Sequence, residues 1–206
     1  MYVRHDLLAI ADLNRALTIN PESTNTILVR AQAQTLMGNY YAAIDDCAHL
    51  IELDSNDVTA YAKRAFCFLY TKQTMAALVF FTKAINKNPQ QTADVYFARG
   101  YCYHVTNAFQ QALDDYNKAI SLDPNYTDAY LNIGNCNYAL RNFEKSFEAY
   151  AIAERLQPVN STIYYARGFN YIETGEPNKA YIEWRKALAL DNTYVQEYLD
   201  QYCGKK

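Results

Sequence analysis

Small and aromatic residues recur along this chain at spacings of three and four residues, which is the period of one face of an α-helix. In residues 93–126 they form two such runs, and the segment closes with Leu122-Asp123-Pro124. Because proline cannot continue a helix, it ends the second run. The pattern predicts two helices followed by a stop.

The same pattern returns when the sequence is shifted by about thirty-four residues. Tyr96 and Gly100, for example, correspond to Tyr130 and Gly134 in the next copy. Self-similarity at this period is the signature of a stacked helical repeat array. The full repeats predicted in this way are 24–57, 58–92, 93–126, 127–160 and 161–194. Residues 1–23 match only the second helix of a repeat, and residues 195–206 are predicted to form a C-terminal capping helix.

The repeated columns resemble the tetratricopeptide repeat (TPR) family. In the third repeat the matching residues are Tyr96, Gly100, Tyr103, Ala112, Tyr116, Ala119 and Pro124. The chain departs from the family where leucine should precede each glycine, since Arg99, Ile133 and Arg167 stand there. The resemblance implies an all-α fold, a right-handed superhelical solenoid of antiparallel helix pairs, with residues 1–206 as a single domain.

Two further columns predict how the helices pack. Close helix approach requires small side chains at the crossing, and these recur at Ala31, Ala65, Gly100, Gly134 and Gly168. Another column holds arginines, and in three of its repeats the second helix carries carboxylates nearby. We expect structural ion pairs there rather than a cationic site. The arginines are Arg30, Arg64, Arg99 and Arg167, and the acids are Asp45-Asp46, Asp114-Asp115 and Glu183.

Composition narrows the classes of partner. The net charge of −3 at pH 7 gives no field that would attract phosphate backbones, so we expect no nucleic-acid partner. The apolar run Leu7–Ala11 is bracketed by Asp6 and Asp12 and is too short for a signal peptide or a membrane span. We therefore expect no membrane insertion and a cytoplasmic location.

Catalytic and metal chemistry have no visible centre in the sequence. The three histidines, His5, His49 and His104, stand beside no cysteine or carboxylate in a nucleophile or metal pattern. Adjacent acids on a helix point about 100° apart and do not converge on one substrate. Cys67, Cys102 and Cys136 share one repeat column and are expected to be buried thiols rather than disulfides or zinc ligands. The prediction is a protein that is not an enzyme and has no cofactor.

The resemblance implies that the first helix of each repeat lines the concave face of the array. Side chains that project inward there are rich in aromatic rings, which either pack against one another or capture apolar side chains of a partner. We favour capture, because other residues fill the packing columns, and we interpret the chain as a scaffold binding a protein or peptide partner. The predicted partner-binding residues are Lys63, Phe66, Tyr70, Phe97, Tyr101, His104, Leu131, Asn132, Asn135, Tyr138, Tyr165 and Phe169.

Two other assignments complete the predictions. The family's two-carboxylate clamp needs lysine and arginine at inner positions where this chain has neither, so that activity is not carried over. The alternative to the groove is self-assembly, because the unpaired helix at residues 4–20 leaves Leu7, Leu8 and Leu13 without a first-helix partner. A homo-oligomer would then form through this segment.

Overall fold

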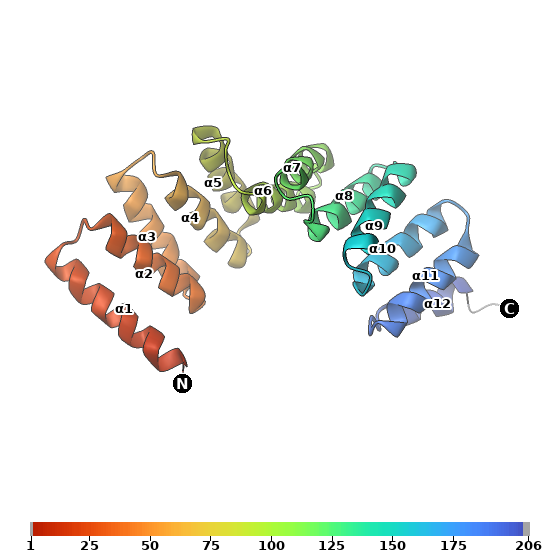
Figure 1. The fold of residues 1–206 in the computed structure, drawn as a ribbon, viewed down its shortest axis with the longest axis horizontal. Helices are drawn as coiled ribbons and strands as arrows, with labels where there is room; N and C mark the ends of the chain where they lie inside the picture. The colour runs from red at the N-terminus through yellow and green to blue at the C-terminus, as the bar shows by residue number, and fades with distance from the viewer. Residues whose placement is uncertain (1, 204–206) are drawn as a thin grey trace. The chain divides into compact units, whose positions relative to one another are not determined.

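The computed structural model describes residues 2–203, and the side chains of residues 8–202. All regular secondary structure in this part of the chain is α-helical (Figure 1). The helices are α1 Tyr2–Ile19, α2 Thr24–Leu36, α3 Tyr40–Leu53, α4 Val58–Tyr70, α5 Thr74–Lys87, α6 Ala93–Val105, α7 Phe109–Leu122, α8 Thr127–Ala139, α9 Phe143–Leu156, α10 Ser161–Glu173, α11 Pro177–Ala189 and α12 Val195–Cys203. The predicted all-α helical solenoid is thereby confirmed.

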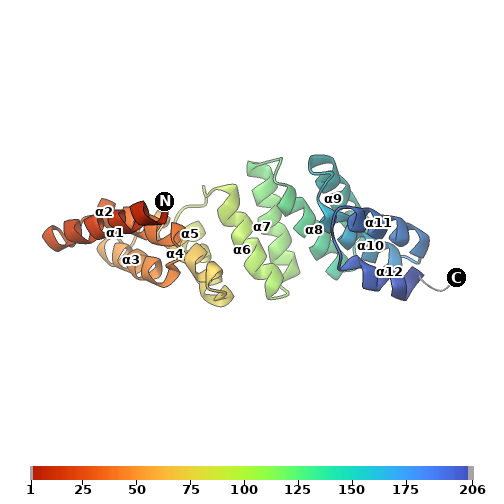
Figure 2. The same cartoon turned by 90° about the horizontal axis from the view of Figure 1, so that it is seen from below.

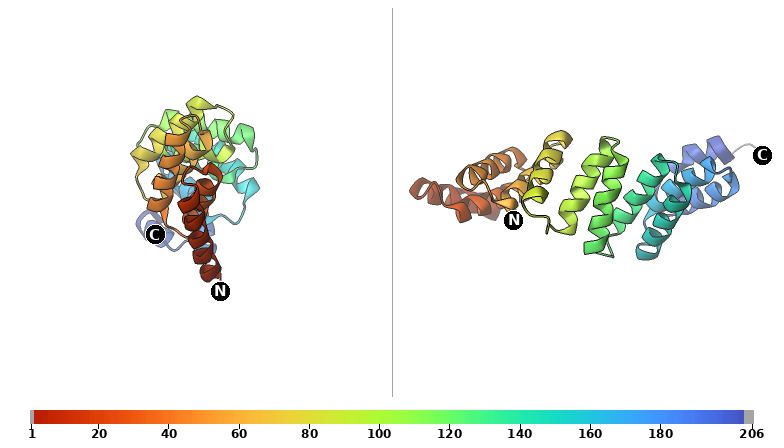
Figure 3. Two further views of the ribbon diagram at one scale, coloured as in Figure 1. Left: turned by 90° about the vertical axis from the view of Figure 1, so that its left-hand side faces the viewer. Right: turned by 90° about the horizontal axis from the view of Figure 1, so that it is seen from above.

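The chain divides into two compact units, Met1–Val105 and Thr106–Lys206. In the first unit, α1 to α5 each pack against the next helix along the chain (Figure 3). In the second unit, α7 to α11 do the same, and α8 also touches α10 (Figure 2). The assignment of the whole chain to one domain, and the hand of the superhelix, stay predictions.

The turn inside each repeat has one residue in the left-handed backbone region. The residues are Gly38, Lys72, Asn107, Arg141 and Gly175, with φ between 59° and 78°. In the first complete repeat the Gly38 amide donates to the Thr35 carbonyl and the Asn39 amide to the Gln34 carbonyl, at 3.0 and 2.8 Å. This double hydrogen bond is the Schellman motif that ends a helix.

The column of small residues marks a tight helix crossing, as predicted. A methyl group added to Gly134 would overlap the ring of Tyr150, and one added to Gly168 would overlap the indole of Trp184. Both rings lie on the second helix of the same repeat and are fully buried. In an earlier repeat Ala65 and Phe81 occupy the corresponding positions, and both are also fully buried.

The arginine column forms ion pairs in two of the repeats where acids follow. Arg30 Nη2 lies 2.6 Å from Asp46 Oδ1, and Arg167 Nη2 lies 2.6 Å from Glu183 Oε2. Arg64 belongs to the repeat without such an acid, and its guanidinium lies over the ring of Phe80 at 4.6 Å. A cation–π contact therefore takes the place of the ion pair there.

Burial also settles the character of most cysteines. Cys47, Cys67 and Cys136 are buried thiols outside any disulfide, and Cys102 is buried as well. Burial raises the pKa of Cys47 and that of Cys136 to about 12. The side chains of Cys203 and His5 lie outside the described residues.

Residues 2–203 contain neither a helix suited to cross a membrane nor a cluster of metal-ligating side chains. None of their helices combines the length and apolar composition that a membrane crossing needs. No group of three or more histidine, cysteine or acidic side chains is placed to hold a metal ion.

Candidate functional site

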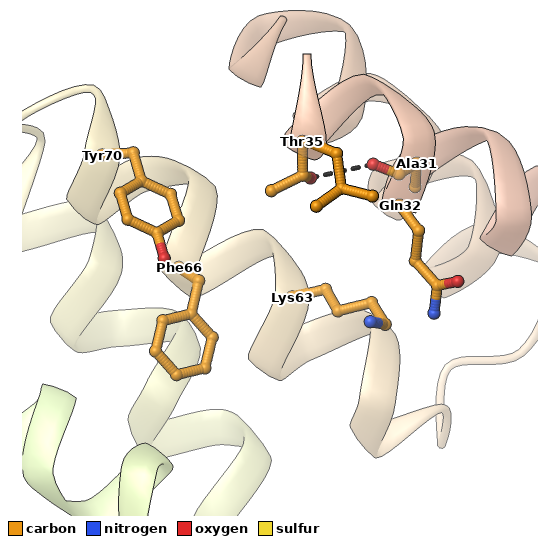
Figure 4. A pocket seen from close by; sticks show the side chains of 7 residues that line it. Ala31, Gln32, Thr35, Lys63, Phe66 and Tyr70 are labelled. Carbon is orange, nitrogen blue, oxygen red and sulfur yellow. Dashed lines mark hydrogen bonds between the residues drawn. The ribbon is translucent and has the colours of Figure 1, made fainter. Parts of the chain in front are cut away.

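A pocket of about 350 Å³ opens between α2 and α4 in the first unit (Figure 4). Three of the predicted partner-binding residues, Lys63, Phe66 and Tyr70, line it from α4. Their spacing of three and four residues places them on one helix face. The lining residues from α2 are Ala31, Gln32, Thr35 and Leu36.

The rings that line this pocket are held by neighbours outside it. Phe66 packs edge-on against the buried ring of Phe81, with ring centroids 4.9 Å apart. Tyr70 stacks on Tyr40 at 5.0 Å and is still 55% exposed. The pocket wall is therefore fixed on one side and open to a ligand on the other.

Polar groups at the pocket are few. The Thr35 hydroxyl donates to the Ala31 carbonyl at 2.8 Å, so it is already satisfied. Lys63 is the one charged residue among the lining side chains. Figure 4 shows its side chain between Gln32 on one side and the Phe66 and Tyr70 rings on the other. The site combines an apolar wall with a single ammonium group.

The helix α6 carries three more of the predicted residues. Phe97, Tyr101 and His104 share one face by their spacing. Tyr101 is 41% exposed, whereas Phe97 and His104 are half-buried. Tyr101 is therefore the ring on this helix that presents most of its surface to solvent.

In the second unit, the predicted partner-binding residues on α8 include a buried leucine and two asparagines. Leu131 is only 8% exposed and packs in a core cluster with Tyr150 and Ile163, so it offers little surface to a partner. Asn135 accepts a hydrogen bond from the Tyr150 hydroxyl at 2.8 Å. Asn132 donates to the backbone carbonyl of Asp128 at 2.8 Å and stays half-exposed.

Tyr138 lies at the C-terminal end of α8. Its ring packs against Phe143 with centroids 6.0 Å apart. Burial raises the pKa of Tyr138 above its usual value. The phenol is therefore neutral at physiological pH and can act there as a hydrogen-bonding group.

Tyr165 and Phe169 on α10 belong to an aromatic cluster. Phe169 makes perpendicular contacts with Tyr165, Trp184 and Tyr198, with centroids 4.9 to 5.3 Å apart. Tyr198 comes from α12, the helix that follows the last full repeat. Ring packing, the alternative weighed against capture, accounts for most contacts of Phe169.

Tyr165 also lines a second cavity, of about 470 Å³, between α10, α12 and the loop that joins α11 to α12. None of its other lining residues is among the predicted partner-binding residues. A signal was present, since tyrosines and acids cluster between residues 191 and 198. The other lining residues are Ser161, Thr162, Asp191, Asn192, Tyr194, Glu197 and Tyr198.

Comparison with known sequences gives a family match and two partial relatives. Residues 93–126 match the family described as Tetratricopeptide repeat. A Homo sapiens protein, "Protein SGT1 homolog", is 33% identical over 75 residues, which is 36% of this chain and 20% of that protein. Its Bos taurus counterpart is 32% identical over 80 residues, covering 39% and 24%. The matched part is therefore about a quarter or less of these relatives.

Solved structures resemble the chain over most of its length. The crystal structure of YrrB, described as a TPR protein with an unusual peptide-binding site, superposes with a TM-score of 0.81 at 19% identity, covering 92% of this chain and 97% of that one. The crystal structure of MamA protein gives a TM-score of 0.75 at 22% identity, with 89% and 97% covered. At these identities the likeness is one of fold.

Proposed function

We propose that the chain, whose fold resembles that of TPR proteins and whose residues 93–126 match the tetratricopeptide repeat, is an adaptor that holds a peptide or helix of a protein partner. The fold supports a protein–protein interaction module in general, and such modules are typically not enzymes. The proposal adds that the ligand binds on the faces of the first helices within each unit.

The pocket between α2 and α4 is the observation that carries the proposal. It is open, lined mainly by apolar surface, and flanked by the half-exposed ring of Tyr70. Exposed aromatic surface beside a pocket is typical of the anchoring points of protein interfaces. The resemblance in fold to YrrB, whose description names a peptide-binding site, is consistent with this reading.

The lining residues indicate the chemistry of the ligand. An apolar or aromatic side chain would fill the space against Phe66 and Tyr70. Lys63 would then meet a carboxylate or a backbone carbonyl next to that anchor. We therefore propose a segment in which an apolar anchor is followed or preceded by an acidic residue.

An array of peptides in which an apolar residue stands next to an acidic one tests the proposal. The affinity of each selected peptide for the protein is then measured by calorimetry. Tyr70→Glu should weaken the selected peptides at least tenfold, because it places a charge in the apolar wall. Tyr41→Glu is the matched control: Tyr41 is 68% exposed on α3 and does not line the pocket. Equal affinities for both variants would reject the pocket as the peptide site.

A Lys63→Met variant tests whether the Lys63 ammonium group contacts the acidic residue of the peptide. Peptides with the acidic residue should lose affinity for this variant, whereas peptides with glutamine in its place should bind both proteins alike. If the acidic and glutamine peptides respond equally, Lys63 makes no specific contact.

Self-assembly through residues 4–20 is a second candidate. One face of α1 is used in packing, since Leu17 lies in a core cluster with Ile27. Away from that cluster Leu8 is 58% and Ile19 is 87% exposed. We propose that the parent chain dimerises and that a Leu8→Glu, Ile19→Glu variant sediments as a monomer. If sedimentation velocity shows that the parent chain and the variant are both monomeric, self-assembly through this segment is excluded.

A further inference from the structure

The cavity between α10 and α12 differs in charge from the pocket in the first unit. Its lining residues are either neutral or acidic, and none is basic. Asp191 and Glu197 supply two carboxylates, and both residues are exposed. Neither side chain forms an ion pair or a hydrogen bond with the residues that the structure describes. The cavity therefore has negative charge that no internal cation neutralises.

Aromatic rings form the walls of this cavity. Tyr165 and Tyr198 pack edge to face against each other, at an angle of 63° and with their centroids 5.9 Å apart. Tyr194 adds a third ring and is 81% exposed. The face of an aromatic ring attracts a cation, and several rings around one site form the cage that binds alkylammonium groups.

From these features we infer that the cavity is a subsite for a lysine side chain of a partner peptide, with the ammonium group held by the carboxylates of Asp191 and Glu197 and its methylene stem against Tyr165, Tyr194 and Tyr198. An ammonium group offers three donors that radiate to separate acceptors, whereas a planar guanidinium prefers one paired acceptor. The inference deepens the proposed function and rests on it, but it concerns a different unit from the pocket of Lys63.

Titration with three blocked tripeptides tests the subsite. Acetyl-Gly-Lys-Gly-amide should shift the NMR signals of the Tyr165, Tyr194 and Tyr198 rings. The norleucine analogue has a similar stem without the charge, and the glutamate analogue reverses the charge; both should bind at least tenfold more weakly. Equal binding of the lysine and norleucine peptides would overturn the inference.

Variants of exposed residues identify the groups that bind. Asp191→Asn with Glu197→Gln should weaken the lysine peptide at least tenfold, and Tyr194→Ala should weaken it severalfold. The control is Asp200→Asn, an exposed carboxylate on α12 that does not line the cavity, and it should bind as the parent does. Unchanged affinity of the double variant would overturn the inference.

Three further outcomes distinguish a free amine from a lysine side chain and this inference from the adaptor proposal. If methylammonium binds as tightly as the lysine peptide, the cavity takes a free amine and the peptide subsite is rejected. If the lysine peptide fails while array peptides still bind at Tyr70, this inference falls and the adaptor proposal stands. If both fail, the adaptor proposal falls with it.

Discussion

The backbone of Gly168 lies directly against the indole of Trp184, sixteen residues further along the chain. The indole Nε1 donates a hydrogen bond to the Tyr165 carbonyl at 3.1 Å, which holds the ring in place. Gly168→Ala should therefore lower the free energy of unfolding by about 1–3 kcal/mol through overpacking, although alanine is the better helix former. Urea unfolding followed by circular dichroism measures this change.

A double-mutant cycle shows whether the ring is the cause. Ala65 and Phe81 occupy the same positions in an earlier repeat, so phenylalanine and alanine fit together at this crossing. Combining Gly168→Ala with Trp184→Phe should cost less than the sum of the two single changes. Strict additivity would mean that the strain at Gly168 comes from another contact.

The Arg167 guanidinium links two carboxylates inside the second unit. It donates from Nε and Nη2 to Glu183 Oε2 at 2.8 and 2.6 Å, and from Nη1 to Glu154 Oε2 at 2.6 Å. Arg167→Met should destabilise the chain by up to about 3–5 kcal/mol, because it leaves the buried Glu183 with only the half-exposed Lys186, 3.1 Å from its Oε1 atom, as a cation. Thermal unfolding of the variant, compared with Arg141→Met at an exposed ion pair, checks this prediction.

The hydrogen bond from Arg167 to Glu154 makes the stability of the protein depend on pH. It lowers the pKa of Glu154 below the ordinary value. A depressed pKa contributes stability above the unfolded-state pKa, and this is lost as the pH falls through the folded-state pKa. Stability should therefore decline below about pH 4.5, and Glu154→Gln should show a smaller decline. Chemical unfolding at pH 6 and pH 3 makes the comparison.

Lys72 occupies a backbone conformation that glycine adopts more easily. Its φ is 60°, and Gly38 with a φ of 77° fills the equivalent turn of the preceding repeat. Lys72→Gly should raise the stability by about 0.5–1 kcal/mol, whereas Gly38→Ala should lower it by about 1 kcal/mol. Lys72→Ala is the control and should change little. A loss of stability for Lys72→Gly, or a gain for Gly38→Ala, would contradict the strain argument.

The buried thiols should resist alkylation in the folded protein. Only a thiolate reacts, and burial raises the pKa of Cys47 and of Cys136 to about 12 and shifts that of Cys67 in the same direction. Iodoacetamide at pH 8 should leave these three sites unmodified until urea is added. Peptide mass mapping follows each site separately.

The sequence predicted the features that recur with the repeat period. The close approach at Gly134 and Gly168 and the ion pair of Arg167 with Glu183 are confirmed, since each depends on a column that several repeats share. Glu154 was missed as a partner of Arg167, because it comes from the preceding second helix. Contacts between neighbouring repeats depend on how successive helices pack. They cannot be predicted from one column of equivalent residues.

The candidate sites were predictable to a smaller extent. Lys63, Phe66 and Tyr70 do line one pocket, as their spacing on one helix face suggests. Phe169 was predicted to lie on an open surface, but Tyr165 and Trp184 of its own repeat contact its ring. Tyr198 on α12 packs against it as well. A ring's exposure depends on the helix that follows, and for the last repeat that helix is outside the repeat itself.

Trp184 is the one tryptophan of the chain, and it is fully buried between α10 and α12. Tryptophan emission, excited at the red edge of the absorption band where the 20 tyrosines do not absorb, therefore reports on this locality alone, whereas ellipticity sums over every helix. Superimposable fluorescence and ellipticity melting curves would mean that all helices lose order as one cooperative block. A red shift that precedes the fall in ellipticity would show that the C-terminal end frays first.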